Sequence, residues 1–244
     1  MGWWIAAALA AYFVKGLCGF ANTLVFNAIL SFGQSNLAIT PVELLVSTPS
    51  NLLMAWRERR AINWKMCLPL CAVLLAGCIP GALLLKSVNA DAVKLLCGAV
   101  IAGLGLEMLC RKPGSGQKKQ SRVGMLLIGL LSGVLCGLFG VGALMGAYLS
   151  RITEDSHAFK ANLCVVFLAE NLFRLLWYAW LGMLSGDMLF KALALYPAML
   201  LGLWLGMRSS RVLNEKAARR VVLVMLVVSG AALIVTSLLA MLGV

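Results

Sequence analysis

Two glycine-containing interruptions of apolar sequence constrain most strongly how this chain can fold. The first is Lys15-Gly16-Leu17-Cys18-Gly19-Phe20-Ala21-Asn22-Thr23, and the second is Gly133-Val134-Leu135-Cys136-Gly137-Leu138-Phe139-Gly140-Val141-Gly142. They share a Leu-Cys-Gly core, and apolar sequence flanks both. In a membrane, broken backbone is tolerated only where protein buries it or where it lines a cavity. We therefore expect the two breaks to face each other at the heart of a transport site.

The composition places the chain in a membrane. Of its 244 residues, 62% are hydrophobic and only 12% are charged, too few to cover a soluble core of this size. The net charge of +12 lies mostly in short loops, as the positive-inside rule produces, so we expect the lipid bilayer as partner and no nucleic acid. The cysteines show no CxxC spacing, and Cys67 and Cys71 have no histidine nearby. We expect neither a metal site nor a cofactor.

The expected orientation follows from the charge of the loops. The basic loops around 57–65, 111–122 and 208–220 should be cytoplasmic, and the connections 33–40, 86–91 and 182–187 should lie outside. Because each full crossing moves the chain to the other side of the membrane, the loop 151–157 must then be cytoplasmic and both chain termini must lie outside. The apolar runs are 3–17, 19–32, 41–56, 65–85, 92–110, 123–136, 138–150, 158–181, 187–207 and 217–242.

The interrupted segments are too short to be pairs of full spans. Each half of 123–150 has about 14 residues, or ~21 Å of helix, against a hydrocarbon core of ~30 Å. The sequence therefore predicts a re-entrant hairpin of two half-helices there, and another over 3–32. The alternative is a single broken helix that crosses once, which would place the loop 151–157 outside.

The two halves echo each other. Asn51-Leu52-Leu53 corresponds to Asn171-Leu172-Phe173, and a proline followed by Gly-x-x-x-Gly recurs at Pro69, Gly77 and Gly81 and again at Pro197, Gly202 and Gly206. We interpret the Gly-x-x-x-Gly pairs as sites of close helix packing. The predicted fold is an all-α polytopic membrane protein of two inverted repeats, each a re-entrant or broken helical hairpin plus three transmembrane helices. The repeats are 1–110 and 123–244, joined by a cytoplasmic linker, 111–122.

These motifs resemble the sulfite exporter TauE/SafE family over nearly the whole chain. The resemblance implies a permease for sulfur-containing anions such as sulfite, sulfonates or thiosulfate. Many relatives carry a glycine run where this chain has Phe20-Ala21-Asn22 and Gly142-Ala143, which leaves the particular anion open.

Candidate binding residues gather at the breaks. We expect helix N-termini at Gly19 and Gly137, with Gly140 beside the second, to offer free N–H groups to an anion. Lys15 would supply countercharge, unless it reaches the membrane interface instead. Asn22 and Thr23 either donate to the anion or cap their own helix.

Two polar helices supply further candidates. Ser47, Thr48 and Asn51 surround Pro49 in the third apolar run and are expected to line the site. In the second half, Asn171 and Arg174 are candidate anion ligands and Glu170 is a possible proton-coupling group. The alternative for Glu170 and Arg174 is a structural i, i+4 ion pair.

Other polar residues are assigned structural roles. Thr40-Pro41-Val42-Glu43 predicts a capping box, which would keep Glu43 out of the site. The tips at Cys18 and Cys136 require small residues; contact of these thiols with a sulfur substrate is the alternative. His157 is expected in a loop, with no catalytic role.

The sequence thus predicts a secondary transporter that moves a small sulfur-containing oxyanion by alternating access. The expected location is the cell membrane, crossed several times, and specifically a bacterial inner membrane. The alternatives are a passive anion channel on the same scaffold and a membrane-embedded enzyme. We disfavour the enzyme because no nucleophile–base pair, paired carboxylates or metal cluster occurs at membrane depth.

Overall fold

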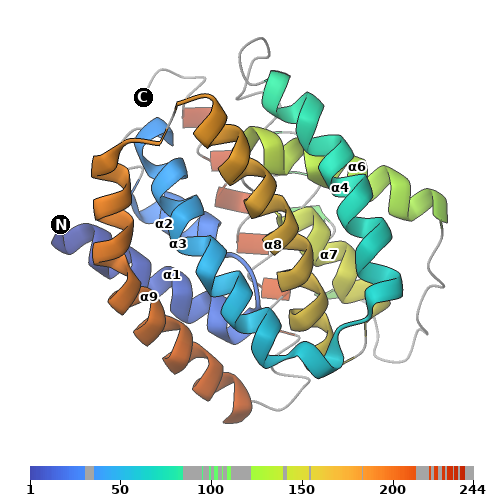
Figure 1. Cartoon of the computed structure of the whole chain (residues 1–244). Coiled ribbons are helices and arrows are strands. Elements are labelled where there is room, and N and C mark those ends of the chain that lie inside the picture. The colour runs from blue at the N-terminus through green and yellow to red at the C-terminus, as the bar shows by residue number, and fades with distance from the viewer. Residues whose placement is uncertain are drawn as a thin grey trace.

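The computed structural model describes residues 1–30, 36–84, 122–139, 142–153, 155–182 and 184–212, with isolated positions between 95 and 110 and between 220 and 239. The regular secondary structure of these ranges is helical throughout (Figure 1). The helices are α1 (Gly2–Cys18), α2 (Asn22–Leu30), α3 (Asn36–Arg57), a short 3-10 helix η1 (Arg59–Ala61), α4 (Trp64–Leu84), α6 (Arg122–Phe139), α7 (Ala143–Ile152), α8 (Ser156–Trp180) and α9 (Gly186–Val212).

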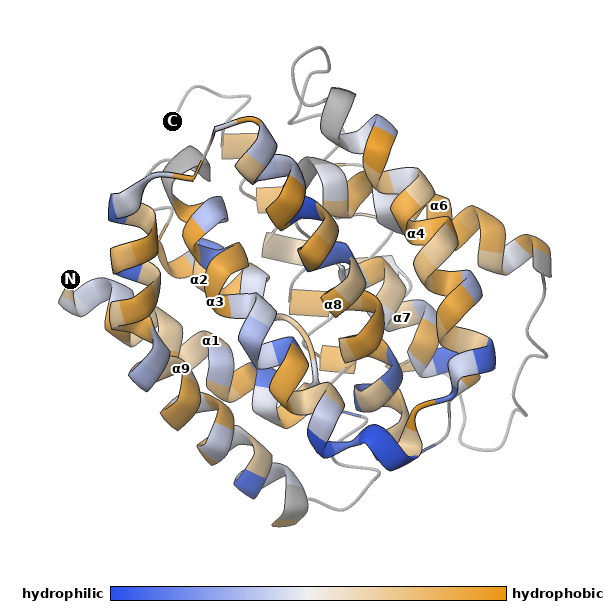
Figure 2. Ribbon diagram, in the orientation of Figure 1, coloured by the Kyte–Doolittle hydropathy of each residue, from blue (hydrophilic) through white to orange (hydrophobic). Residues whose placement is uncertain are grey.

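Three of the described helices are long and apolar enough to cross a membrane: α4, α8 and α9. Their outward faces carry large apolar side chains, including Leu176, Phe190 and Trp204, all of which are exposed. Hydrophobic residues also dominate the visible parts of α4 and α9 in Figure 2. Apolar side chains that point away from the core belong against lipid, so the chain has the character of a helical membrane protein.

The first interrupted segment folds back on itself, as the sequence predicts for 3–32. The indole Nε1 of Trp3, at the start of α1, donates to the carbonyl of Ile29, near the end of α2, at 3.2 Å. The rings of Trp4 and Phe26 meet edge to face with centroids 5.9 Å apart. Contacts between the first turn of one helix and the last turns of the next require an antiparallel hairpin.

The second interrupted segment is also broken into two helices, α6 and α7. The 10 residues of α7 extend only about 15 Å at 1.5 Å per residue, too short to cross a bilayer core of ~30 Å. This agrees with the half-helix expected for this part of the chain.

Two expected helix starts are wrong. Gly19 does not begin a helix: it is the left-handed C-cap of α1, with φ 91°, and its N–H donates to the Lys15 carbonyl. Gly137 lies inside α6. The N-termini near the breaks are those of α2 at Asn22 and of α7 at Ala143. The short run Phe20–Ala21 and the glycine at 142 make the turns, so each helix restarts after them.

The predicted capping box at Thr40–Glu43 is also wrong. α3 begins at Asn36, so Pro41 lies within the helix instead of at its first position. Glu43 therefore belongs to the body of α3, where its side chain is 2% exposed. A proline within the first two turns is compatible with a helix because the early N–H groups have no intrahelical acceptor.

The Gly-x-x-x-Gly pairs bring helices into backbone contact, which confirms their predicted packing role. A Cβ on Gly206 of α9 would strike the Phe13 carbonyl of α1, and one on Gly16 would lie 2.9 Å from the carbonyl carbon of Gly206. In the same way, Gly77 of α4 lies against Leu130 and Gly133 of α6. Each crossing therefore joins a helix from one half of the sequence to a helix from the other.

The described helices enclose two apolar cores. One core is formed mainly by α1, α2, α3 and α9, and includes Tyr12, Phe26, Val46 and Leu203. The other is formed mainly by α4, α6, α7 and α8, and includes Leu74, Met145 and Phe167. Because α1 pairs with α9 and α4 with α6, the packing units are not the two halves of the sequence. The α3 and α8 helices lie side by side where the units meet (Figure 1).

Several sequence predictions fall outside the described residues. They concern the connection 86–91, residues 111–121 of the linker and Gly140, together with most of the run 92–110 and half of the run 217–242. Of the expected connection 33–40, residues 33–35 lie outside the described residues, and residues 36–40 belong to α3 instead.

Candidate functional site

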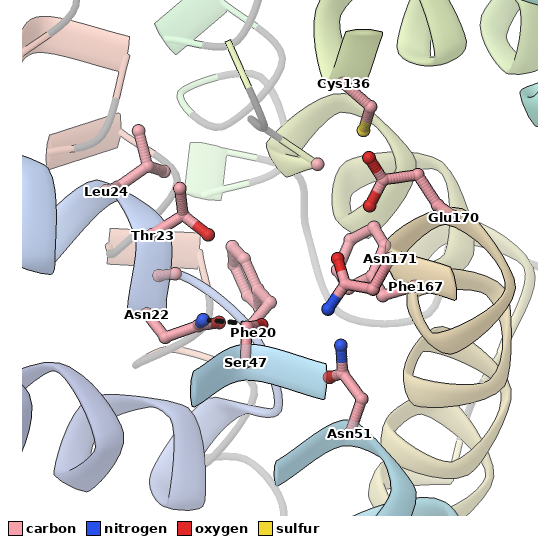
Figure 3. Close-up of a pocket in the computed structure, with 12 residues that line it drawn as sticks. Phe20, Asn22, Thr23, Leu24, Ser47, Asn51, Cys136, Phe167, Glu170 and Asn171 are labelled. Atoms are coloured by element: carbon pink, nitrogen blue, oxygen red, sulfur yellow. Dashed lines mark hydrogen bonds between the residues drawn. The ribbon is translucent and has the colours of Figure 1, made fainter. Parts of the chain in front are cut away.

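A pocket lies between the two chain breaks, with α3 and α8 forming its sides (Figure 3). The first break and the start of α2 supply one wall, and the second break supplies the opposite wall. The breaks therefore face each other, as expected from the sequence. The lining residues are Phe20, Ala21, Asn22, Thr23, Leu24, Ser47, Asn51, Cys136, Gly142, Phe167, Glu170 and Asn171.

Two asparagines, from the similar sequences Asn51-Leu52-Leu53 and Asn171-Leu172-Phe173, point into the pocket. Asn51 is 1% exposed and its Oδ1 has no hydrogen-bond partner among the described residues. Asn171 is 5% exposed, and its Nδ2 has none either. Figure 3 shows the two amides directed at each other from α3 and α8. Buried polar atoms without partners are rare because each costs about 1–3 kcal/mol, so these amide groups are available to a ligand or to water.

The polar residues at the start of α2 bond to α3. Asn22 Nδ2 donates to Glu43 Oε1 at 2.7 Å and to Ser47 Oγ at 3.1 Å. Thr23 Oγ1 donates to the same Glu43 oxygen at 2.9 Å. These two side chains therefore bind a neighbouring helix, and the alternative of local capping is not what the fold uses. Their backbone N–H groups have no acceptor within their own helix because they lie in its first turn.

Glu170 and Arg174 form the i, i+4 ion pair that the sequence offered as the structural alternative. Arg174 donates to Glu170 Oε1 at 3.3 Å and to the Tyr178 hydroxyl at 3.2 Å. Both charged side chains are buried, at 3% and 4% exposure. Glu170 lines the pocket, whereas Arg174 is not among the lining residues and stands behind the carboxylate.

Lys15 is fully buried in α1 but does not line the pocket. Its Nζ has no hydrogen-bond partner among the described residues and lies 5.7 Å from the centroid of the Tyr12 ring. A lysine with no exposure does not extend to a membrane interface, so the alternative of an interfacial lysine is wrong. Its charge acts on the region from behind the first break.

The remaining candidates divide between the pocket and the scaffold. Thr48 Oγ1 donates to the Leu44 carbonyl of its own helix, and Thr48 is not among the lining residues. Gly19 and Gly137 do not line the pocket either. Cys136 does, whereas the Cys18 thiol donates to the carbonyls of Val14 and Phe20. The two matched cysteines therefore differ in their surroundings.

Sequence reasoning missed Glu43 and the two aromatic walls, Phe20 and Phe167. A signal for Glu43 was present, because Glu43, Ser47 and Asn51 follow each other at intervals of four and so share one helical face. The wrong helix start hid this pattern. No comparable signal marks Phe20 and Phe167, which resemble ordinary core residues in the sequence.

The pocket suits a small anion held by neutral donors. No lysine or arginine occurs among the described lining residues, and Glu170 is their only carboxylate. The N-termini of α2 and α7 open at the pocket, at Asn22 and Gly142, and α7 has no side-chain cap. Free N–H groups and the positive ends of helix dipoles stabilise negative charge. Among the described residues, no cluster of His, Cys, Asp and Glu could hold a metal ion.

Comparison with known proteins agrees with the resemblance seen in the motifs. The model of the family described as "Sulfite exporter TauE/SafE" matches residues 4–233. A relative from Cupriavidus necator, named "Probable sulfite/organosulfonate exporter TauE", is 25% identical over 231 residues, which cover 87% of this chain and 90% of the relative. No solved structure matches the chain. The match over nearly the whole length shows that this protein belongs to the sulfite exporter TauE/SafE family.

Proposed function

We propose that the protein is a secondary transporter that moves a small sulfur-containing oxyanion, of the sulfite, sulfonate or thiosulfate class, by alternating access. Membership of an exporter family supports transport as the activity. The observation that carries the proposal is the pocket between the breaks, where two helix N-termini and the unpartnered Nδ2 donor of Asn171 converge, with the Asn51 amide opposite. Such an arrangement binds oxyanions because every donor is fixed in place before the ligand arrives.

Inverted repeats over 1–110 and 123–244, with 111–122 as linker, form part of the proposal. The hairpin of α1 and α2 and the break between α6 and α7 support it, as does the reciprocal packing of α1 on α9 and of α4 on α6. Inverted repeats that place broken helices around a central site are the common architecture of secondary transporters. The accompanying location is the cell membrane, with multiple crossings, in a bacterial inner membrane.

The candidate residues take three roles in this proposal. Asn22, Thr23, Ser47, Asn51 and Asn171 provide hydrogen bonds at the pocket wall. Lys15 and Arg174 supply positive charge from behind it. Gly19 ends α1 at the first break, Gly137 and Gly140 remain proposed binding residues near the second break, and Thr48 has a structural role through its bond to the Leu44 carbonyl.

Flux into proteoliposomes tests the proposal. Labelled sulfite and thiosulfate should enter vesicles that contain the protein, at a rate that depends on a proton or counter-ion gradient. Flux that simply follows the electrochemical gradient of the anion would identify a passive channel instead. Lys15→Ala and Arg174→Ala should each lower the rate, whereas Lys65→Ala, at an exposed lysine in the first turn of α4, should not. Unchanged flux in the first two variants would remove both residues from the mechanism.

A further inference from the structure

Glu43 is a buried carboxylate directly behind the pocket wall. It comes from α3, is 2% exposed, and faces the first turn of α2. A single oxygen, Oε1, accepts from both Asn22 Nδ2 and Thr23 Oγ1. The carboxylate therefore holds the side chains of two residues that line the pocket.

These hydrogen bonds use up the side-chain donors at this wall. Asn22 Nδ2 has two hydrogens, one directed to Glu43 and one to Ser47 Oγ. The Thr23 hydroxyl has a single hydrogen, which also goes to Glu43. A carboxylate is itself an oxyanion, so it occupies the groups that a substrate oxyanion would require.

We propose that Glu43 couples proton uptake to anion binding: its carboxylate occupies the Asn22 and Thr23 donors, and its protonation releases them to the substrate. A proton taken from water converts the carboxylate to a neutral carboxyl group, which accepts hydrogen bonds more weakly. The inference rests on the proposed function, because it assumes that the pocket binds an oxyanion.

The buried charges around Glu43 favour this exchange. Two buried cations lie near Glu43: Lys15 of α1 and Arg174 of α8. Arg174 is already balanced by Glu170. Lys15 and Glu43 therefore balance each other, and an added anion would leave one negative charge in excess. If Glu43 takes up a proton, the anion replaces it as the counter-ion of Lys15.

The other titratable groups near α3 do not offer the same exchange. Tyr12 of α1 and Tyr196 of α9 are phenols and not carboxylic acids, and the described part of α2 contains no titratable side chain. Lys160, the other buried cation of α8, donates to Ser210 of α9. Glu170 lines the pocket, but its protonation would break the ion pair with Arg174 and leave a buried guanidinium without its partner.

Anion binding by the purified full-length protein, followed across about pH 5.5 to 8, tests the inference. Thiosulfate and methanesulfonate are suitable probes because neither titrates in this range. In the wild type, affinity should fall by up to about tenfold per pH unit as pH rises, as expected when one proton and one anion bind together. Glu43→Gln, which keeps the shape and removes the titration, should bind with pH-independent affinity near the wild-type value at low pH. Glu58→Gln, at a surface glutamate paired with His157, should behave as wild type.

Proton uptake provides a second measurement that needs no variant. In weakly buffered solution with an indicator dye, the wild type should take up about one proton for each anion bound. Anion binding without proton uptake, or unchanged pH dependence in a folded Glu43→Gln protein, would overturn the inference and leave the proposed function intact. A wild-type protein that binds neither anion at any pH would overturn both.

Discussion

The side-chain amides of Asn51 and Asn171 face each other across the pocket, one from α3 and the other from α8 (Figure 3). The two residues occupy matching places in the echoed sequences Asn-Leu-Leu and Asn-Leu-Phe. Each carries a buried amide atom without a partner among the described residues. A ligand between them would contact both structural units at once.

Removing either amide should weaken anion binding. Asn171→Ala deletes an unpartnered donor and so a hydrogen bond to a charged ligand, worth about 1.5–3 kcal/mol, or roughly 10- to 150-fold in Kd, and Asn51→Ala removes the amide that faces it across the pocket. Asn171→Asp should weaken binding further because it adds a negative charge to the pocket. Titration with thiosulfate checks these values. Thr48→Ala is the control, since Thr48 Oγ1 bonds only within α3 and lies outside the lining; an equal loss there would contradict the assignment.

Removing one partner of the Glu170–Arg174 ion pair should destabilise the fold more than replacing both partners. Glu170→Gln leaves Arg174 buried without its anion and should destabilise the fold by about 3–5 kcal/mol. Replacing both residues with apolar side chains of similar size, Glu170→Leu and Arg174→Met, should recover most of that loss. Unfolding in detergent measures the effect, and a double variant no more stable than Glu170→Gln would count against it.

The helix crossings should not tolerate side chains larger than glycine. Gly206→Val would push α1 away from α9, and Gly133→Val would push α6 away from α4. Each should lower the free energy of unfolding by about 1–3 kcal/mol or more, because rigid backbone lies in the way. The thermal unfolding midpoint reports the change. Gly103→Val is a matched control at a helical glycine with open space around it, and it should have little effect.

The first break contains a residue in an unfavourable conformation. Ala21 has φ 71°, a left-handed value that costs an L-residue roughly 1–2 kcal/mol. Ala21→Gly should therefore stabilise the protein by about 1 kcal/mol, seen as a higher unfolding midpoint. The same change at Ala6, on the exposed surface of α1, should instead destabilise by about 1 kcal/mol, because glycine is a poor helix residue.

The membrane orientation predicted from loop charge can be read with reporter fusions. Fusions within the linker 111–122 and near Arg59 should report the cytoplasm, because basic loops are retained there. A fusion after Val244 should report the outside. A cytoplasmic signal at Val244 would contradict the predicted order of membrane crossings, and with it the opposite orientation of the two proposed repeats.

The sequence was most informative where a pattern has one physical cause. Broken apolar runs too short to span, paired small residues and an i, i+4 charge pair each led to the right element. These features depend on local geometry, which a single chain segment determines. The hairpin formed by α1 and α2 and the packing role of Gly77 and Gly206 were predictable for this reason.

Predictions failed where the answer depended on a helix boundary. Placing the start of α3 at Pro41 turned Glu43 into a cap and separated it from Ser47 and Asn51, with which it shares a face. The same kind of error put helix starts at Gly19 and Gly137, a few residues before the turns where α2 and α7 begin. Proline and glycine are permitted at several positions near a helix end. They therefore indicate that a helix end is close but do not identify the first residue of the helix.

The exchange of helices between the sequence halves has a consequence for biosynthesis. On the ribosome, α1 is made first, but its packing partner α9 emerges only after more than two thirds of the chain is complete. Until then, the face of α1 that contains Phe13 and Gly16 lacks its partner helix, and one side of the hairpin that carries the first break remains unpacked. A chain that terminates before Gly186 would therefore lack the packing partner of α1. Its first-synthesised helices would be the least stable part of the protein and would be exposed to quality-control proteases.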